Sequence, residues 1–179
     1  VLRRGSSLGD YMSPTEEGPV ELTFLRMVGP PVTPHALSGR NIRLTEQPLR
    51  VGSRCHFDRA YTFISLGDFA DNPMMRYVRT SNNDKSTPED KLMWELEVHM
   101  PVKIYLNFRS EGHVTDTGVS VWLEHFGWEL SQMASTVSTG YPNGPYSGPV
   151  YSRTVDSGVV ELWGSNCDEG CYFVFIEII

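Results

Sequence analysis

The feature of this sequence that most constrains its fold is a series of short extended segments, each bounded by residues that favour turns. The segments cover residues 56–63, 75–80, 102–108, 159–163 and 172–179. Gly and Pro cluster between such runs, as at 140–145 and 147–149, and clusters of this kind mark turns or loops. Short apolar runs separated by turn residues are typical of β-strands. We therefore predict an all-β fold, in which two antiparallel sheets form a jelly-roll-like β-sandwich with at most one short helix.

Two of these segments indicate where the core lies. In 102–108 the apolar residues alternate with Lys103 and Asn107, which predicts a half-buried strand with one face in water. The segment 172–179 is apolar on both faces except at Glu177, which predicts a central strand that is covered on both sides. From this alternation we expect the core to contain Val102, Ile104, Leu106, Val160, Leu162, Val174 and Ile176.

The length of the chain fits one main domain. A chain of 179 residues can bury about 70% of its unfolded surface, so we expect a single β-sandwich domain over residues 20–179. Residues 1–19 are poor in apolar side chains, and their composition is that of an extended arm or linker. In 121–133 apolar residues recur at three- and four-residue spacing, which predicts a short helix or crossover there. Because the sequence starts at Val1 without Met, we expect a piece of a larger protein.

Charge and hydropathy exclude two classes of partner. The net charge is -7 and the pI is about 5.2, whereas binding to nucleic acid needs a clustered basic surface. The apolar run at 172–179 is far shorter than the roughly 20 residues that a transmembrane helix requires. We expect neither nucleic-acid binding nor membrane insertion.

Three cysteines bear on the cellular compartment. Cys167 and Cys171 flank a loop between two predicted strands, where Gly170 can adopt the positive φ that a hairpin tip requires. We predict a disulfide between Cys167 and Cys171, with Cys55 free or paired elsewhere; reduced thiols are the alternative. Zinc is less favoured because a Cys-x3-Cys spacing without a nearby His is not typical of zinc sites. A disulfide would indicate an extracellular protein, and the alternative location is an intracellular assembly.

Several short motifs resemble a known family when they are taken in order. They are 57–63, 75–85, 102–108, 121–123 with 127–128, 150–153 with 158–162, and 172–175. Over about residues 55–179 the chain resembles the β-sandwich accessory domain attached to secreted polysaccharide-degrading enzymes. Trp163 and Ser165 interrupt the glycine-rich hairpin of that family, and its pattern lacks the cysteine pair. The resemblance implies a carbohydrate-module fold without catalytic activity.

Residues that could carry catalysis do not form a recognised pattern. His35, His56, His99, His113 and His125 show no metal-type pairing, and the sequence has no nucleophile elbow, phosphate-binding glycine loop or H-E-x-x-H motif. We predict a non-enzymatic domain without a metal site or cofactor. The charged residues of the resemblance, Asp58, Arg59, Asp84 and Lys85, are interpreted as a structural network of ion pairs and turns. Calcium binding by Asp58 and Asp84 is the alternative.

Aromatic residues give the better indication of function. Sugar rings stack on flat exposed aromatic side chains with polar groups nearby. Trp163 and Glu161 alternate with the inward-facing Val160 and Leu162, and the predicted ligand or partner surface also includes the loop tyrosines Tyr141, Tyr146 and Tyr151. Trp94, Trp122 and Trp128 are expected in the core.

The functional prediction is a non-catalytic module of a larger secreted protein. It would bind carbohydrate or act as a structural or interaction domain towards a neighbouring protein domain. The alternatives are a subunit of an intracellular or organellar assembly and, less favoured, a hydrolytic enzyme.

Overall fold

The structure is a computed structural model that describes residues 29–133, 137–138 and 148–179. The predicted arm at 1–19, Tyr141 and Tyr146 lie outside the described residues. The strands are β1 (Val32–Ala36), β2 (Arg43–Leu44), β3 (Ser65–Leu66), β4 (Met75–Arg79), β5 (Leu92–Val98), β6 (Val102–Asn107), β7 (Glu129–Leu130), β8 (Val137–Ser138), β9 (Val150–Val155), β10 (Gly158–Trp163) and β11 (Phe173–Ile178). Two α-helices, α1 (Glu111–Thr115) and α2 (Val119–His125), and two short 3-10 helices, Gly67–Phe69 and Asn82–Ser86, lie between them.

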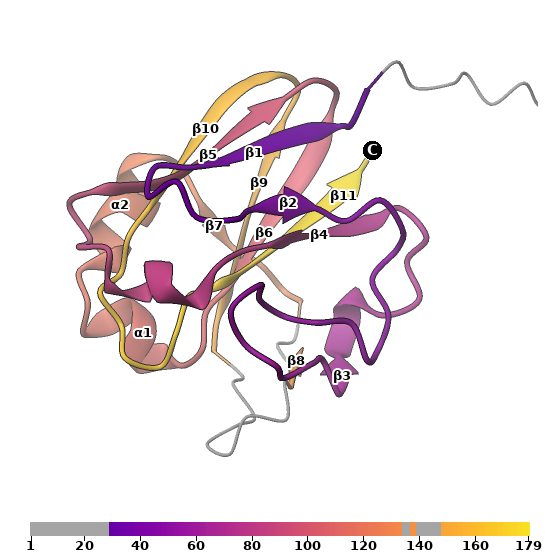
Figure 1. Cartoon of the computed structure of the whole chain (residues 1–179). Helices are drawn as coiled ribbons and strands as arrows, with labels where there is room; N and C mark the ends of the chain where they lie inside the picture. Colours follow the sequence, from indigo (N-terminus) through magenta and orange to yellow (C-terminus); the bar gives the residue numbers. More distant parts are fainter. Residues whose placement is uncertain (1–28, 134–136, 139–147) are drawn as a thin grey trace, which may run out of the picture.

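The strands form two main antiparallel sheets. The smaller has the order β1-β5-β10, and the larger has the order β2-β4-β11-β6-β9-β7. A further pair, β3 with β8, lies apart from both sheets at the lower edge of Figure 1. The two-sheet β-sandwich predicted from the sequence is confirmed.

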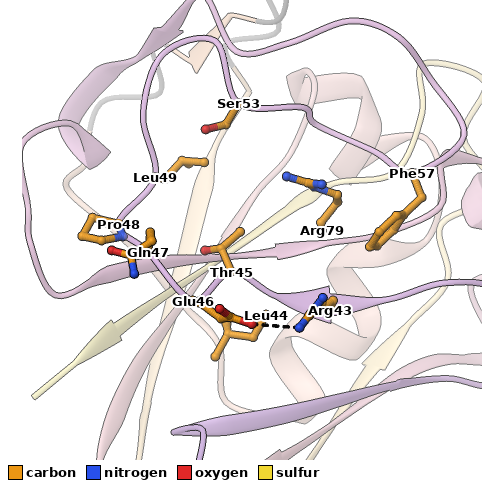
Figure 2. Close-up of a pocket in the computed structure, with 10 residues that line it drawn as sticks. All are labelled: Arg43, Leu44, Thr45, Glu46, Gln47, Pro48, Leu49, Ser53, Phe57 and Arg79. Atoms are coloured by element: carbon orange, nitrogen blue, oxygen red, sulfur yellow. Dashed lines mark hydrogen bonds and ion pairs between the residues drawn. The ribbon is translucent and has the colours of Figure 1, made fainter.

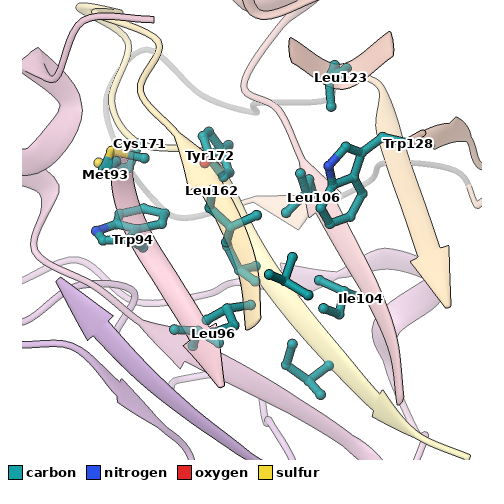
Figure 3. Close-up of a cluster of buried hydrophobic side chains, with 14 of the residues drawn as sticks. Met93, Trp94, Leu96, Ile104, Leu106, Leu123, Trp128, Leu162, Cys171 and Tyr172 are labelled. Atoms are coloured by element: carbon teal, nitrogen blue, oxygen red, sulfur yellow. The ribbon is translucent and has the colours of Figure 1, made fainter. Parts of the chain in front are cut away.

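The main core lies between the two sheets. Figure 3 shows Trp94, Leu96 and Leu162 of the smaller sheet facing Ile104 and Leu106 of the larger one. All seven residues predicted for the core are at most 2% exposed. Trp94, Trp122 and Trp128 are also buried, as predicted.

The larger sheet is covered on its second face as well. The segment between β2 and β4 places Leu49, Cys55, Phe63 and Phe69 in a second buried cluster, which also contains Phe173 and Phe175 of β11. The predicted central strand with two covered faces is therefore confirmed for β11, which lies between β4 and β6.

The same cover corrects two predictions. Strand β6 does not have one face in water, because Tyr105 packs against Phe69 of this segment and Asn107 is also buried. Residues 56–63 do not form a strand but cross the sheet as a loop with isolated bridges at His56 and Thr62.

In the described residues there are two short α-helices, one more than predicted. They lie together at one end of the sandwich (Figure 1). Helix α2 buries Val119, Trp122 and Leu123 against the core. It ends at His125, earlier than the predicted helical stretch, because Gly127 adopts a φ of 69° and the chain turns into β7. No helix in the described part of the chain is both long and apolar enough to span a membrane.

Residues 164–172 connect the two sheets, which corrects the cysteine predictions. Strand β10 belongs to the smaller sheet and β11 to the larger, so this segment, the crossover loop, is not the tip of a hairpin. The predicted disulfide between Cys167 and Cys171 is absent: both thiols and that of Cys55 are free and buried. The thiol of Cys171 points towards the backbone oxygen of Ser81 at 3.6 Å. The argument for secretion that rested on this disulfide therefore loses its basis.

Candidate functional site

Trp163 borders a hollow at the end of the smaller sheet. We call it the Trp163 hollow; it has a volume of about 450 Å³ and is lined by Glu89, Asp90, Gly118, Val121, Trp122, His125, Phe126 and Trp163. The rings of Trp163 and Phe126 are stacked, with centroids 5.8 Å apart and planes at 26°. Val121 is 71% exposed, and Glu89, Asp90 and His125 are also exposed. An apolar aromatic surface thus adjoins charged and polar side chains.

The backbone around Trp163 is held by long-range contacts. The Tyr172 hydroxyl donates to the carbonyl oxygen of Trp163 at 2.8 Å, and the Trp122 indole donates to the carbonyl oxygen of Gly164 at 3.2 Å. Gly164 N–H donates to the carbonyl oxygen of Lys91 at 2.9 Å. These bonds fix the end of β10 against the segment that carries Glu89 and Asp90, so the hollow is built from preorganised backbone.

Gly164 and Gly118 permit the close approach of the segments that form this hollow. A Cβ atom at Gly164 would overlap the carbonyl oxygens of Thr87 and Pro88. Gly118 has a φ of 72°, and a Cβ there would lie 3.1 Å from the Glu89 side chain. Gly164 is required for its close contact with these oxygens. Gly118 is required for its positive φ as well as for the contact with Glu89.

The other predicted binding residues do not all join Trp163. Glu161 is on β10 like Trp163, but it lies opposite Glu95 of β5 and does not line the hollow. Tyr151 is in β9 of the other sheet, with its ring 5.9 Å from that of Phe108. Of the described candidates, only Trp163 lines this hollow.

Asp58 and Arg59 lie together in a polar network. The Asp58 carboxylate accepts hydrogen bonds from Ser81 Oγ at 2.6 Å and from the N–H groups of Asn82 and Asn83 at 2.8 and 2.9 Å. Burial acts to raise the pKa of Asp58, but these hydrogen bonds and the Arg59 cation outweigh it and lower the pKa. Arg59 also donates to Asn83 Oδ1 at 2.8 Å. The carboxylate thus stabilises the start of the 3-10 helix at 82–86.

Asp84 and Lys85 tie neighbouring segments to the same 3-10 helix. Asp84 is buried and accepts from Arg40 at 2.7 Å and from the Trp94 indole at 2.9 Å. Lys85 donates to the carbonyl oxygen of Asp168 at 2.9 Å. All four charged residues singled out in the sequence therefore make contacts within the fold.

A second hollow has a different chemical character. It has a volume of about 370 Å³, and Figure 2 shows its lining, which comprises Arg43, Leu44, Thr45, Glu46, Gln47, Pro48, Leu49, Ser53, Phe57 and Arg79. The Arg79 guanidinium lies over the Phe57 ring, 5.4 Å from its centroid. Arg43 pairs with Glu46 at 2.8 Å. The Arg79 cation thus already covers one face of the Phe57 ring in this hollow.

The sequence did not indicate that two of the histidines, His56 and His113, are buried. His56 Nε2 accepts from Arg109 Nη2 at 2.9 Å, and its Nδ1 lies 3.1 Å from Thr80 Oγ1. Burial, followed by the Arg109 cation, lowers the pKa of His56 to about 3. Burial and Arg109 likewise lower the pKa of His113 to about 3. Both imidazoles are therefore neutral near pH 7.

Sequence reasoning found Trp163 but missed the partners that complete its surroundings. Phe126 appeared on the apolar stripe of the predicted helix, and Glu89 and Asp90 carried no recognisable signal. The Gly residues at 118 and 164 could have indicated close backbone approach, although not between which segments.

Comparisons with known proteins concern the fold alone. No protein-family profile matches this sequence, and no curated protein is significantly similar to it. The fold is similar to part of a solved β-glucuronidase from glycoside hydrolase family 2, with a TM-score of 0.55 and 15% identity. The similarity covers 82% of this chain but 14% of that enzyme. A β-sandwich of this kind therefore occurs within a glycoside hydrolase.

Proposed function

We propose that this domain is a non-catalytic module that binds carbohydrate at the Trp163 hollow. The observation that carries the proposal is the stacked pair of Trp163 and Phe126 beside an exposed rim of polar groups. The apolar faces of sugar rings pack on aromatic rings, while sugar hydroxyls need hydrogen-bonding groups at the edge.

The chemistry of the rim favours neutral sugars. Glu89 and Asp90 are acceptors for hydroxyl groups when ionised, and they repel carboxylate or sulfate groups on a ligand. The net charge of -7 acts in the same direction. A volume of about 450 Å³ is in the range of small-ligand sites and matches a short stretch of a polysaccharide rather than a protein surface.

Binding without hydrolysis fits the position of the carboxylates. Most glycosidases use two carboxyl groups on opposite sides of the scissile bond, whereas Glu89 and Asp90 are consecutive residues on one rim. The β-glucuronidase that contains a similar fold is far longer than this chain. This supports a role as an accessory module of a larger carbohydrate-active protein.

The proposal is tested by binding to neutral polysaccharides. Affinity electrophoresis and pull-down with cellulose, xylan, mannan and β-glucan should identify a ligand, and calorimetry with its oligosaccharides should give the Kd. Trp163→Ala should weaken binding by about 1 kcal/mol or more, which is about fivefold in Kd. Val159→Ala is the matched control, because Val159 lies on the same strand, is 62% exposed and does not line the hollow.

Two other outcomes would redirect the assignment. If Phe57→Ala rather than Trp163→Ala abolishes binding, the sugar site is the hollow of Figure 2. If no polysaccharide binds at high protein concentration, the carbohydrate proposal fails and the domain is better interpreted as an interaction module towards a neighbouring domain.

A further inference from the structure

Three side chains that can bind a metal ion meet where the crossover loop passes α1. His113 comes from α1, and Cys167 and Glu169 come from the loop. One ligand atom from each lies within 4.8 Å of the other two. His113 is 1% and Cys167 9% exposed, whereas Glu169 is exposed. Two ligands are therefore fixed in the fold, and the third opens the site to solvent.

The contacts around the cluster position its members. Ser110 Oγ accepts the backbone N–H of His113 at 3.1 Å and donates to Glu169 Oε2 at 2.7 Å. Within the loop, Cys167 N–H donates to the carbonyl oxygen of Lys85 at 3.1 Å, and Gly170 N–H donates to the carbonyl oxygen of Cys167 at 3.2 Å. A single serine thus holds the start of α1 and the carboxylate together.

The imidazole of His113 is oriented on both sides. Its Nε2 lies 2.8 Å from Ser165 Oγ, and its Nδ1 accepts from Arg109 N–H at the longer distance of 3.4 Å. A metal ion would replace one of these contacts. The other would then fix the ring, as hydrogen bonds to the second ring nitrogen do in metal sites.

The donor set selects among metals. One imidazole nitrogen, one thiolate sulfur and one carboxylate oxygen suit zinc, which binds all three types at about 2.0–2.3 Å. In a tetrahedral site the ligand atoms are then about 3.5 Å apart. Rotation of the exposed Glu169 side chain can close the remaining distance, and water can supply the fourth ligand.

We propose that His113, Cys167 and Glu169 bind a zinc ion, which joins α1 to the crossover loop. The sequence alone gave no sign of this site, because Cys167 was paired with Cys171 and no histidine lies near it in the chain. The fold brings His113 to Cys167. This inference does not depend on carbohydrate binding.

Cobalt provides a spectroscopic test in the reduced chain of 179 residues. Co²⁺ added to metal-free protein should give thiolate-to-cobalt charge-transfer absorption in the near ultraviolet together with intense visible bands of a four-coordinate ion. Zn²⁺ should displace the cobalt. At a hundredfold excess over Kd, Zn²⁺ should raise the Tm by about 5 °C or more.

Matched variants assign the ligands. Cys167→Ser should abolish the charge-transfer band. Cys55→Ser should retain it, because Cys55 lies in the buried cluster beneath the segment between β2 and β4. Glu169→Gln should weaken Zn²⁺ binding at least tenfold, whereas Asp168→Asn, the neighbouring exposed carboxylate, should leave it unchanged. Glu169 is on the surface, so its variant keeps the test valid if the cysteine variant does not fold.

Three results would overturn the proposal. They are the absence of a charge-transfer band and of a Tm shift in the unmodified protein, a band that survives Cys167→Ser, and equal Zn²⁺ affinity in Glu169→Gln and Asp168→Asn. Each can be obtained whether or not a polysaccharide ligand is found.

Discussion

Acidification should destabilise this domain through its buried histidines. A histidine in an unfolded chain has a pKa of about 6.5, whereas burial next to Arg109 lowers the pKa of His56 to about 3. The unfolded state therefore binds more protons than the folded state between about pH 3 and 6.5. The free energy of unfolding must fall as the pH drops through that window and be highest above pH 6.5.

The two pKa values set the size of the effect. At pH 5 the unfolded imidazole is almost fully protonated and the folded one is almost fully neutral, so His56 lowers the free energy of unfolding by about 2 kcal/mol relative to pH 7. In metal-free protein, His113 has a similarly lowered pKa and adds a comparable loss. The sum of about 4 kcal/mol is a large part of the 5–15 kcal/mol typical of a domain.

Urea denaturation followed by tryptophan fluorescence at pH 5, 6 and 7 measures this dependence. His56→Gln should be less stable than the unmodified protein at pH 7, because Gln fits the contacts of the ring poorly. Its loss of stability between pH 7 and pH 5 should nevertheless be smaller by about 2 kcal/mol. His35→Gln is the control, since the His35 side chain is 56% exposed. An unchanged pH dependence in His56→Gln would refute the reasoning.

Three further predictions concern the core, a glycine and the thiols. Leu106→Asp should leave the domain unfolded at 25 °C by circular dichroism, because it places a carboxylate at a position where the side chain is 0% exposed. A folded variant would contradict the core assignment. Gly164→Ala should lower the free energy of unfolding by about 2 kcal/mol or more in urea titrations, since its Cβ would overlap the Thr87 carbonyl oxygen, and an unchanged value would show that the segments separate readily. Mass spectrometry after alkylation should find three labelled thiols in denatured protein without prior reduction and slow labelling in native protein; one label instead of three would indicate a disulfide.

The sequence predicted the sandwich and its inner face because alternation reports directly on burial. Val160 and Leu162 face inward and Val159 is exposed, as their parity in the chain requires. Trp163 follows a shift in register and is partly buried against the core. The same reasoning failed for the outer face of β6, where a distant loop packs on Tyr105 and Asn107 is also buried. Alternation along a strand therefore predicts which face packs in the main core, but not whether the opposite face is covered as well.

The candidate site was predictable only in part. Trp163 was identified as an outward aromatic residue, but its stacking on Phe126 depends on how α2 packs at the end of the sheet. The approach of Glu89 depends on glycines at two separate points. The cysteines were paired with each other because they are close in sequence, whereas the fold places one beside a histidine and the other beside a backbone carbonyl. Such contacts are set by tertiary packing rather than by local pattern.

The central position of β11 has a consequence for how the chain acquires its structure. Its two neighbours, β4 and β6, come from the middle of the sequence, and its side chains belong to both buried clusters. During synthesis on the ribosome, neither hydrophobic layer can close before residues 173–178 have emerged. Such long-range pairing makes folding slow relative to chains with local contacts. The nascent β4 and β6 thus each keep one edge unpaired until late, and unpaired strand edges favour aggregation during folding.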